Sequence, residues 1–193
     1  MKKVILILFA AVLTAFPAAA SEDAVKQAVI REYEMIRDGK FSEILALYTK
    51  DYSSVTANKR KTTYKDIQIM SLMLDGKHPE EFMLFITKAR LAKDPSPEEE
   101  RQLRELARNE QIKLIYAEAC NTMKSVARKT AEISLKTLKF ISVNLSGNQA
   151  EAVCEYEELD PSDTTFTKTV KRTSITRFRK ENGIWKNAGS TQK

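Results

Sequence analysis

The chain has 193 residues, the length of one ordinary domain, and a formal net charge of +6. Basic clusters such as residues 59–61 alternate with acidic stretches such as residues 98–100, which argues against the continuous basic face that a nucleic-acid partner needs. One histidine and no Cys-x-x-Cys pair argue against the usual zinc site, and the five glycines form no phosphate-binding loop. We therefore expect no metal, no cofactor and no nucleic acid.

The first 20 residues have the pattern of a secretory signal peptide. Lys2 and Lys3 precede an apolar run over residues 4–16, and a run of alanines ends at Ala20, just before Ser21. A retained transmembrane helix is the alternative, but the apolar run is shorter than the roughly 18 residues that a membrane span needs. We predict cleavage near Ala20, a single mature domain over residues 21–193 without a transmembrane anchor, and a periplasmic or secreted location.

The first part of the mature chain, as far as about Arg128, has helical periodicity. Apolar residues recur there at three- and four-residue steps, and Gly39 follows the first helix where a left-handed residue is wanted. Ser96 is expected to cap the last helix, and a bend or break is expected near Cys120. A polar hairpin is predicted over residues 51–62. The predicted helices cover residues 25–38, 41–48, 63–75, 79–91 and 97–128.

From about Ala131 onward the sequence pattern predicts β-strands. A change of phase after Leu138 suggests a β-bulge within one long bent strand, and Asn182-Gly183 is a strong signal for a tight hairpin turn. Alternation places Cys154 on the side of the next strand that faces the helices. The predicted strands cover residues 135–145, 149–157, 166–180 and 184–186.

The two cysteines, Cys120 and Cys154, allow two interpretations. An oxidising compartment would permit them to pair, and such a disulfide would contribute about 3 to 4 kcal/mol by closing a long loop. Two separate buried thiols are the alternative. The sequence leaves both open.

Four segments, in this order and spacing, resemble the nuclear-transport-factor-2-like superfamily, which includes the SnoaL-like proteins and the ketosteroid isomerases. They are residues 37–41, residues 44–48 together with Asp51-Tyr52, residues 147–150 and residues 180–186. The resemblance implies an α+β fold in which a curved, mostly antiparallel sheet wraps around N-terminal helices as a cone. Residues 78–128 are longer than the family's usual connection from helix to sheet, so they are interpreted as extra helices inserted before the main strands.

In the resembled fold, the cone encloses a pocket, and aromatic residues with polar tips are the best candidates to hold a ligand there. Arg172 would add an anion-binding group if its side chain faced inward. The alternative is that the aromatic residues form the core that closes the cone. The predicted pocket residues are Tyr33, Tyr48, Tyr52, Tyr156, Arg172 and Trp185.

The resemblance also allows a test for catalysis. Aligned on Gly39, the general-base aspartate of ketosteroid isomerase falls on Thr56, which has no carboxylate, and the tyrosine that stabilises the oxyanion falls on Glu32. Proton abstraction beside a carbonyl needs a base within hydrogen-bond reach, so this chemistry is not supported.

Three functional hypotheses follow from the sequence. The first is an exported, non-enzymatic protein that holds a small apolar or amphipathic ligand in the cone. The second is a module of the cell envelope for protein interaction, including a homodimer formed through the sheet face. The third and weakest is an enzyme of the isomerase or hydratase kind, which two buried acidic groups with raised pKa would favour.

Overall fold

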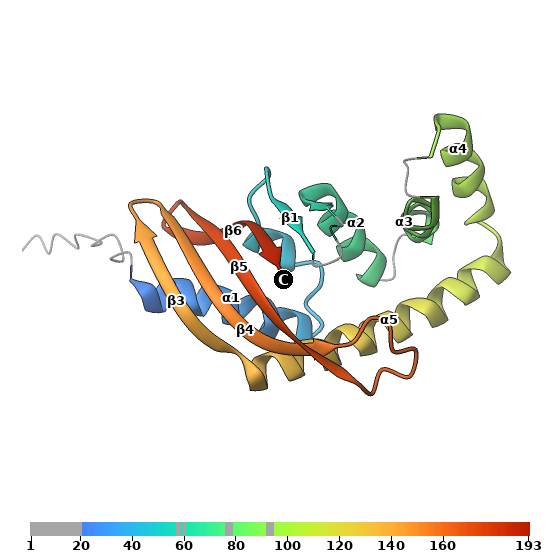
Figure 1. The fold of residues 1–193 in the computed structure, drawn as a ribbon. Helices are drawn as coiled ribbons and strands as arrows, with labels where there is room; N and C mark the ends of the chain where they lie inside the picture. The colour runs from blue at the N-terminus through green and yellow to red at the C-terminus, as the bar shows by residue number, and fades with distance from the viewer. Residues whose placement is uncertain (1–20, 57–58, 60, 76–78, 92–94) are drawn as a thin grey trace, which may run out of the picture.

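The protein has an α+β fold with one six-stranded sheet, as the sequence predicts (Figure 1). The computed structural model describes residues 21–56, 59, 61–75, 79–91 and 95–193, so the predicted signal peptide lies outside the described residues. The helices are α1 (Glu22–Arg37), η1 (Ile44–Leu47), α2 (Tyr64–Asp75), α3 (Pro79–Leu91), α4 (Pro97–Leu106) and α5 (Glu110–Thr137). The strands are β1 (Ser53–Val55), β2 (Lys61–Thr63), β3 (Lys139–Ser146), β4 (Gln149–Leu159), β5 (Thr169–Glu181) and β6 (Ile184–Gln192).

Local sequence signals set the helix ends. The Ser21 side chain accepts a hydrogen bond from the Ala24 backbone N–H at 3.1 Å and caps α1. Gly39, with φ of +74°, lets the chain leave α1 in a left-handed conformation, and a Cβ at this position would collide with the Arg128 guanidinium. Ser96 and Glu99 form the capping box that begins α4.

The strand order in the sheet is β2-β1-β6-β5-β4-β3. All neighbouring strands are antiparallel except β1 and β6, which run parallel. The Asn182-Gly183 turn joins β5 to β6 with positive φ at both residues, 51° and 81°, as a tight hairpin requires. The long antiparallel strands β4 and β5 form the centre of the sheet.

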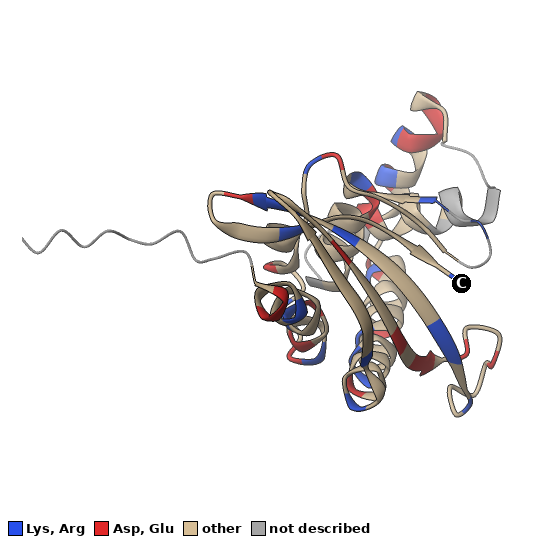
Figure 2. Ribbon diagram, turned by 60° about the vertical axis from the view of Figure 1, so that its left-hand side comes forward, with Lys and Arg blue, Asp and Glu red and all other residues tan. Residues whose placement is uncertain are grey.

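Helices α1 and α5 cover one face of the sheet, which we call the inner face, and neither view shows a helix on the opposite outer face (Figures 1 and 2). Val25 and Val29 of α1 pack against Ala152 and Cys154 of β4 and Trp185 of β6. A second cluster joins α1 to η1, and a third joins α2 to α5. No helix within the described residues is both long and apolar enough to cross a membrane.

The prediction of one helix over residues 97–128, with a break near Cys120, was wrong in two ways. The break falls between α4 and α5 rather than near Cys120, because Asn109 caps a new helix by accepting from the Gln111 backbone N–H at 2.9 Å. Helix α5 then continues to Thr137, through residues predicted as strand. Ser134 explains this, because it is buried on the helix face toward β4 and donates to the Glu157 carbonyl oxygen at 3.0 Å. The predicted bulge exists, between Phe140 and Ser142 of β3.

The disulfide interpretation was wrong as well, since both cysteines are buried free thiols. Cys120 on α5 packs with Met73 and Tyr116, and its thiol donates to the Met73 carbonyl oxygen at 3.0 Å. Cys154 on β4 instead packs with the α1 cluster around Val29. The two thiols belong to different clusters of the core, so they are not partners. The alternative of two separate buried thiols describes the structure.

Candidate functional site

A partly buried carboxylate, that of Glu32, lies on the helix face that α1 turns toward the core. Glu32 is three residues from Val29 and three from Met35, both of which are buried, so helical periodicity places all three on one side. Its carboxylate accepts a hydrogen bond of 2.5 Å from the Tyr48 hydroxyl and one of 3.1 Å from the Asn187 side-chain amide. An isolated parallel β-bridge pairs Tyr48 with Asn187, and it brings these two donors close to each other.

Burial sets the electrostatics around Glu32. Desolvation raises the pKa of the Glu32 carboxyl above its ordinary value, and the hydrogen bonds from Tyr48 and Asn187 oppose that rise. Burial also raises the pKa of Tyr33 and of Tyr48, and the negative charge of Glu32 adds to both shifts. The same charge contributes to the raised pKa of Tyr52 and Tyr156. The charge of one carboxyl group thus acts on the pKa of four tyrosines.

A second polar chain continues along the inner face toward the C-terminus. The rings of Tyr33 and Tyr156 lie 5.8 Å apart, and the Tyr156 hydroxyl accepts from the Gln192 side-chain amide at 2.9 Å. Gln192 also donates to Glu158 at 3.1 Å, and Glu158 pairs with Arg172 at 2.9 Å. We refer to Glu32, Tyr48 and Asn187 together with this chain as the inner-face network.

The structure brings five of the six predicted pocket residues into this network or next to it. The Tyr48 and Tyr52 rings lie 4.7 Å apart in an edge-on arrangement, and both are buried. Arg172 is half-buried and points to Glu158 on the inner face, which is the inward orientation that the sequence left open. Trp185 lies elsewhere, in the apolar cluster with Val25. The aromatic candidates therefore also form part of the core.

Sequence reasoning missed four members of the network, namely Glu32, Glu158, Asn187 and Gln192. One signal was available for Glu32, because a carboxylate interrupts the apolar stripe of α1. Asn187 and Gln192 lie beyond the strand predicted to end at residue 186, since β6 continues to Gln192. Glu158 occupies the position after the predicted end of its strand. Three of the four missed residues thus reflect strands that are longer than predicted.

The position aligned with the catalytic base of ketosteroid isomerase lies outside the network. Thr56 follows β1, in the connection to β2, and its carbonyl oxygen accepts from the Lys59 backbone N–H at 2.8 Å. The aligned position of the tyrosine donor is Glu32 itself, which can accept a hydrogen bond from a ligand and, when protonated, donate one.

The Glu32 carboxylate has hydrogen-bonding capacity that its protein partners do not fill. Glu32 has two carboxylate oxygens, with a capacity of about four hydrogen bonds, and two protein donors use part of it. Tyrosine rings beside the carboxyl offer apolar surface. In the described part of the chain, no group of three or more His, Cys, Asp or Glu side chains forms a metal site.

No protein-family model matches the chain, and no curated protein matches it. Among solved structures, the chain is similar to a nuclear-transport-factor-2-like protein with a cystatin-like fold from Novosphingobium aromaticivorans, at 8% identity and a TM-score of 0.43, over 88% of this chain and 79% of that chain. A second nuclear-transport-factor-2-like protein, from Shewanella oneidensis, has 12% identity and a TM-score of 0.41, over 88% of this chain and 96% of that chain.

A ketosteroid isomerase-like protein from Erwinia carotovora is similar at 11% identity and a TM-score of 0.44, over 90% of this chain and 95% of that chain. The resemblance predicted from the sequence is thus found again among solved structures. At these identities and TM-scores, the likeness concerns the general arrangement of helices and sheet and carries no argument about ligand or activity.

Proposed function

We propose that the protein binds a small amphipathic molecule at the inner-face network. The observation that carries the proposal is the partly buried Glu32 carboxyl, whose charge acts on four tyrosines and which has hydrogen-bonding capacity beyond Tyr48 and Asn187. Burial of this carboxyl group costs free energy, because burial disfavours its charged form, so a role in stabilising the fold alone is a poor explanation for it. A ligand that donates a hydrogen bond to Glu32 offsets that cost.

The chemistry of the network indicates the kind of ligand. Its polar end would carry an amine or a hydroxyl group that donates to Glu32, and its apolar part would lie against the rings of Tyr33 and Tyr156. The role proposed is binding rather than catalysis, because Thr56, which takes the position of the base in the resembled enzyme, lies outside the network.

The proposal is tested with purified protein spanning residues 21–193, by thermal shift and native mass spectrometry against a panel of amphipathic amines and alcohols. Glu32→Gln is the test variant, because it keeps the shape of the side chain and removes the charge. Glu34→Gln is the matched control on the same helix. Binding that is lost in Glu32→Gln and kept in Glu34→Gln supports the proposal, and a panel without any ligand contradicts it.

We also propose that the protein is exported and that residues 1–20 are removed. The support is the sequence pattern together with the position of Ser21, which becomes the first residue after cleavage and is the cap of α1. A cut at this point would leave every described helix and strand intact. Cell fractionation, followed by mass spectrometry of the N-terminal peptide, tests the location and the cleavage point together.

Self-association through the outer face of the sheet is a second candidate function. Val153, Ile175 and Thr191 form one row across neighbouring strands, and Val55 continues the row beyond Thr191. Val55 is 40% exposed, and no helix covers this face in either view (Figure 2). Such a row suits a two-fold interface in which the same surface faces itself.

The outer-face proposal is tested by analytical ultracentrifugation of Ile175→Glu, since a charge in the middle of the row would disrupt a dimer. Leu114→Glu is the control, because Leu114 is 72% exposed on α5, outside the sheet. A dimeric wild type that becomes monomeric only in Ile175→Glu supports the interface. A monomeric wild type at high concentration contradicts it.

A further inference from the structure

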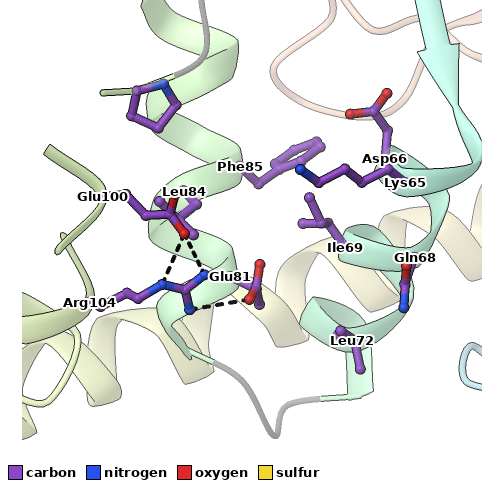
Figure 3. A pocket seen from close by; sticks show the side chains of 11 residues that line it. Lys65, Asp66, Gln68, Ile69, Leu72, Glu81, Leu84, Phe85, Glu100 and Arg104 are labelled. Atoms are coloured by element: carbon purple, nitrogen blue, oxygen red, sulfur yellow. Dashed lines mark hydrogen bonds and ion pairs between the residues drawn. The ribbon is translucent and has the colours of Figure 1, made fainter. Parts of the chain in front are cut away.

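A hollow lies among the helices that precede the main strands, away from the inner-face network (Figure 3). Its volume is about 330 Å³, and α2, α3 and α4 supply most of its walls. This volume is at the lower end of the range of about 300–1,000 Å³ that is typical of small-molecule sites. The apolar part of the wall consists of Ile69 and Leu72 from α2, Leu84 and Phe85 from α3, and Pro95.

The acidic side chains at this hollow already have partners. Arg104 of α4 forms ion pairs with Glu100, at 2.8 Å, and with Glu81 of α3, at 3.3 Å (Figure 3). Asp66 accepts from the Thr63 backbone N–H at 2.8 Å and from its hydroxyl at 2.7 Å, which places it in the cap of α2. None of the three carboxylates is therefore left to attract a cationic ligand.

One cation at the hollow is not neutralised. Lys65 of α2 is exposed, and its side chain extends toward Phe85 (Figure 3). Among the residues that the structure describes, no carboxylate pairs with Lys65. The hollow thus combines an apolar wall with one available ammonium group.

We propose that this hollow is a second binding site, for a small amphipathic carboxylate such as a medium-chain fatty acid. The carboxylate pairs with the Lys65 ammonium group, and the apolar chain lies against Ile69, Leu72, Leu84 and Phe85. Lysine suits this role, since it binds anions as a point charge on a flexible side chain.

Ligand binding in the hollow is expected to stabilise helix α4. None of its residues is buried, and an ion pair from Arg104 to Glu81 joins it to α3. A ligand between α2 and α3 adds apolar contact beside α4. Binding is therefore expected to raise the melting temperature and to protect the amides of α4 from hydrogen exchange.

The experiment uses decanoate as the probe, with decylamine and decanol as comparison compounds, below their micelle-forming concentrations and by isothermal titration calorimetry. In the Glu32→Gln background, which removes the amine site proposed above, the protein is expected to bind decanoate more tightly than decylamine. Lys65→Ala is expected to weaken decanoate binding about tenfold, the effect of losing one charge-assisted hydrogen bond. Lys65→Arg should restore binding, and Lys61→Ala is the matched control, since Lys61 is an exposed lysine on the neighbouring strand.

Two further variants make the outcome decisive. Leu72→Trp, which fills the hollow, should abolish binding of decanoate, whereas Glu32→Gln at the inner-face network should leave it unchanged. The proposal is overturned if decylamine binds Glu32→Gln as tightly as decanoate does, if Lys65→Ala binds decanoate like wild type, or if Glu32→Gln is the variant that loses decanoate binding. Circular dichroism spectra confirm that each variant is folded.

Discussion

The Tyr48 hydroxyl donates a 2.5 Å hydrogen bond to the Glu32 carboxylate, and this contact joins the first helix to the segment before the sheet. The two residues are 16 positions apart in the chain. Because Tyr48 is buried and Glu32 is half-buried, the bond lies where water competes little for either group. It is the centre of the proposed ligand site.

Removal of the Tyr48 hydroxyl is expected to destabilise the protein. Tyr48→Phe keeps the ring but deprives Glu32 of a donor, and a hydrogen bond to a charged group contributes about 1.5–3 kcal/mol. Urea denaturation measures the loss. Tyr64→Phe is the control, because the Tyr64 hydroxyl accepts from Lys50 at an exposed position and its removal should change stability much less. Equal effects of the two variants would mean that the Tyr48–Glu32 hydrogen bond contributes no more to stability than the exposed Tyr64–Lys50 hydrogen bond.

The raised pKa of Glu32 predicts a pH dependence of stability. Just above the ordinary pKa of 4.5, the folded chain keeps a proton on Glu32 that the unfolded chain has released. Stability from this group therefore falls as pH rises through that window, and it levels off below 4.5 and above the raised pKa.

The Glu32→Gln variant tests whether the stability contributed by Glu32 falls as the pH rises. It lacks the titrating group, so its stability relative to wild type should increase as the pH rises above 4.5. Unfolding free energies at a series of pH values, with Glu34→Gln alongside, give the comparison. A relative stability of Glu32→Gln that falls over this window would show that the Glu32 pKa is lowered in the folded state, against the structure.

The two thiols are expected to remain unpaired and unreactive in the folded protein. Burial raises the pKa of Cys154 to about 11 and also raises the pKa of Cys120, so little of the reactive thiolate exists at neutral pH. Ellman's reagent should label two thiols after denaturation and label the native protein only slowly. Rapid labelling of the native protein, or no free thiol after denaturation, would contradict this arrangement of the core.

The predicted removal of residues 1–20 should leave the folding of the domain unchanged. The cap of α1 needs only the Ser21 side chain and the Ala24 backbone N–H, both of which remain. A chain that begins at Ser21 should therefore show the same circular dichroism spectrum as the full-length chain. Ser21→Ala should cost about 1 kcal/mol by loss of the cap. A truncated chain that fails to fold would assign residues 1–20 a structural role.

The sequence was most informative where local rules act. Ser96 and Glu99, Gly39 and Asn182-Gly183 mark helix caps and turns because each depends on a few neighbouring residues. The α+β class and the sheet followed from periodicity for the same reason.

Sequence patterns gave wrong or incomplete predictions where contacts between distant parts of the chain determine the structure. Leu135 was predicted to begin a long bent strand, yet contacts such as Ser134 to Glu157 hold this segment in α5. The candidate tyrosines were recognised by type, but the carboxyl whose charge acts on them was not. Its importance depends on Asn187, which is 155 residues away along the chain and which no local pattern connects to Glu32.

The most direct test of the proposed function is a thermal-shift and calorimetric comparison of wild type, Glu32→Gln and Glu34→Gln against the panel of amphipathic amines and alcohols. We expect at least one compound to raise the melting temperature of wild type and Glu34→Gln, with its affinity reduced about tenfold or more in Glu32→Gln. A panel that stabilises none of the proteins, or a ligand that binds Glu32→Gln as tightly as wild type, would contradict binding at the inner-face network.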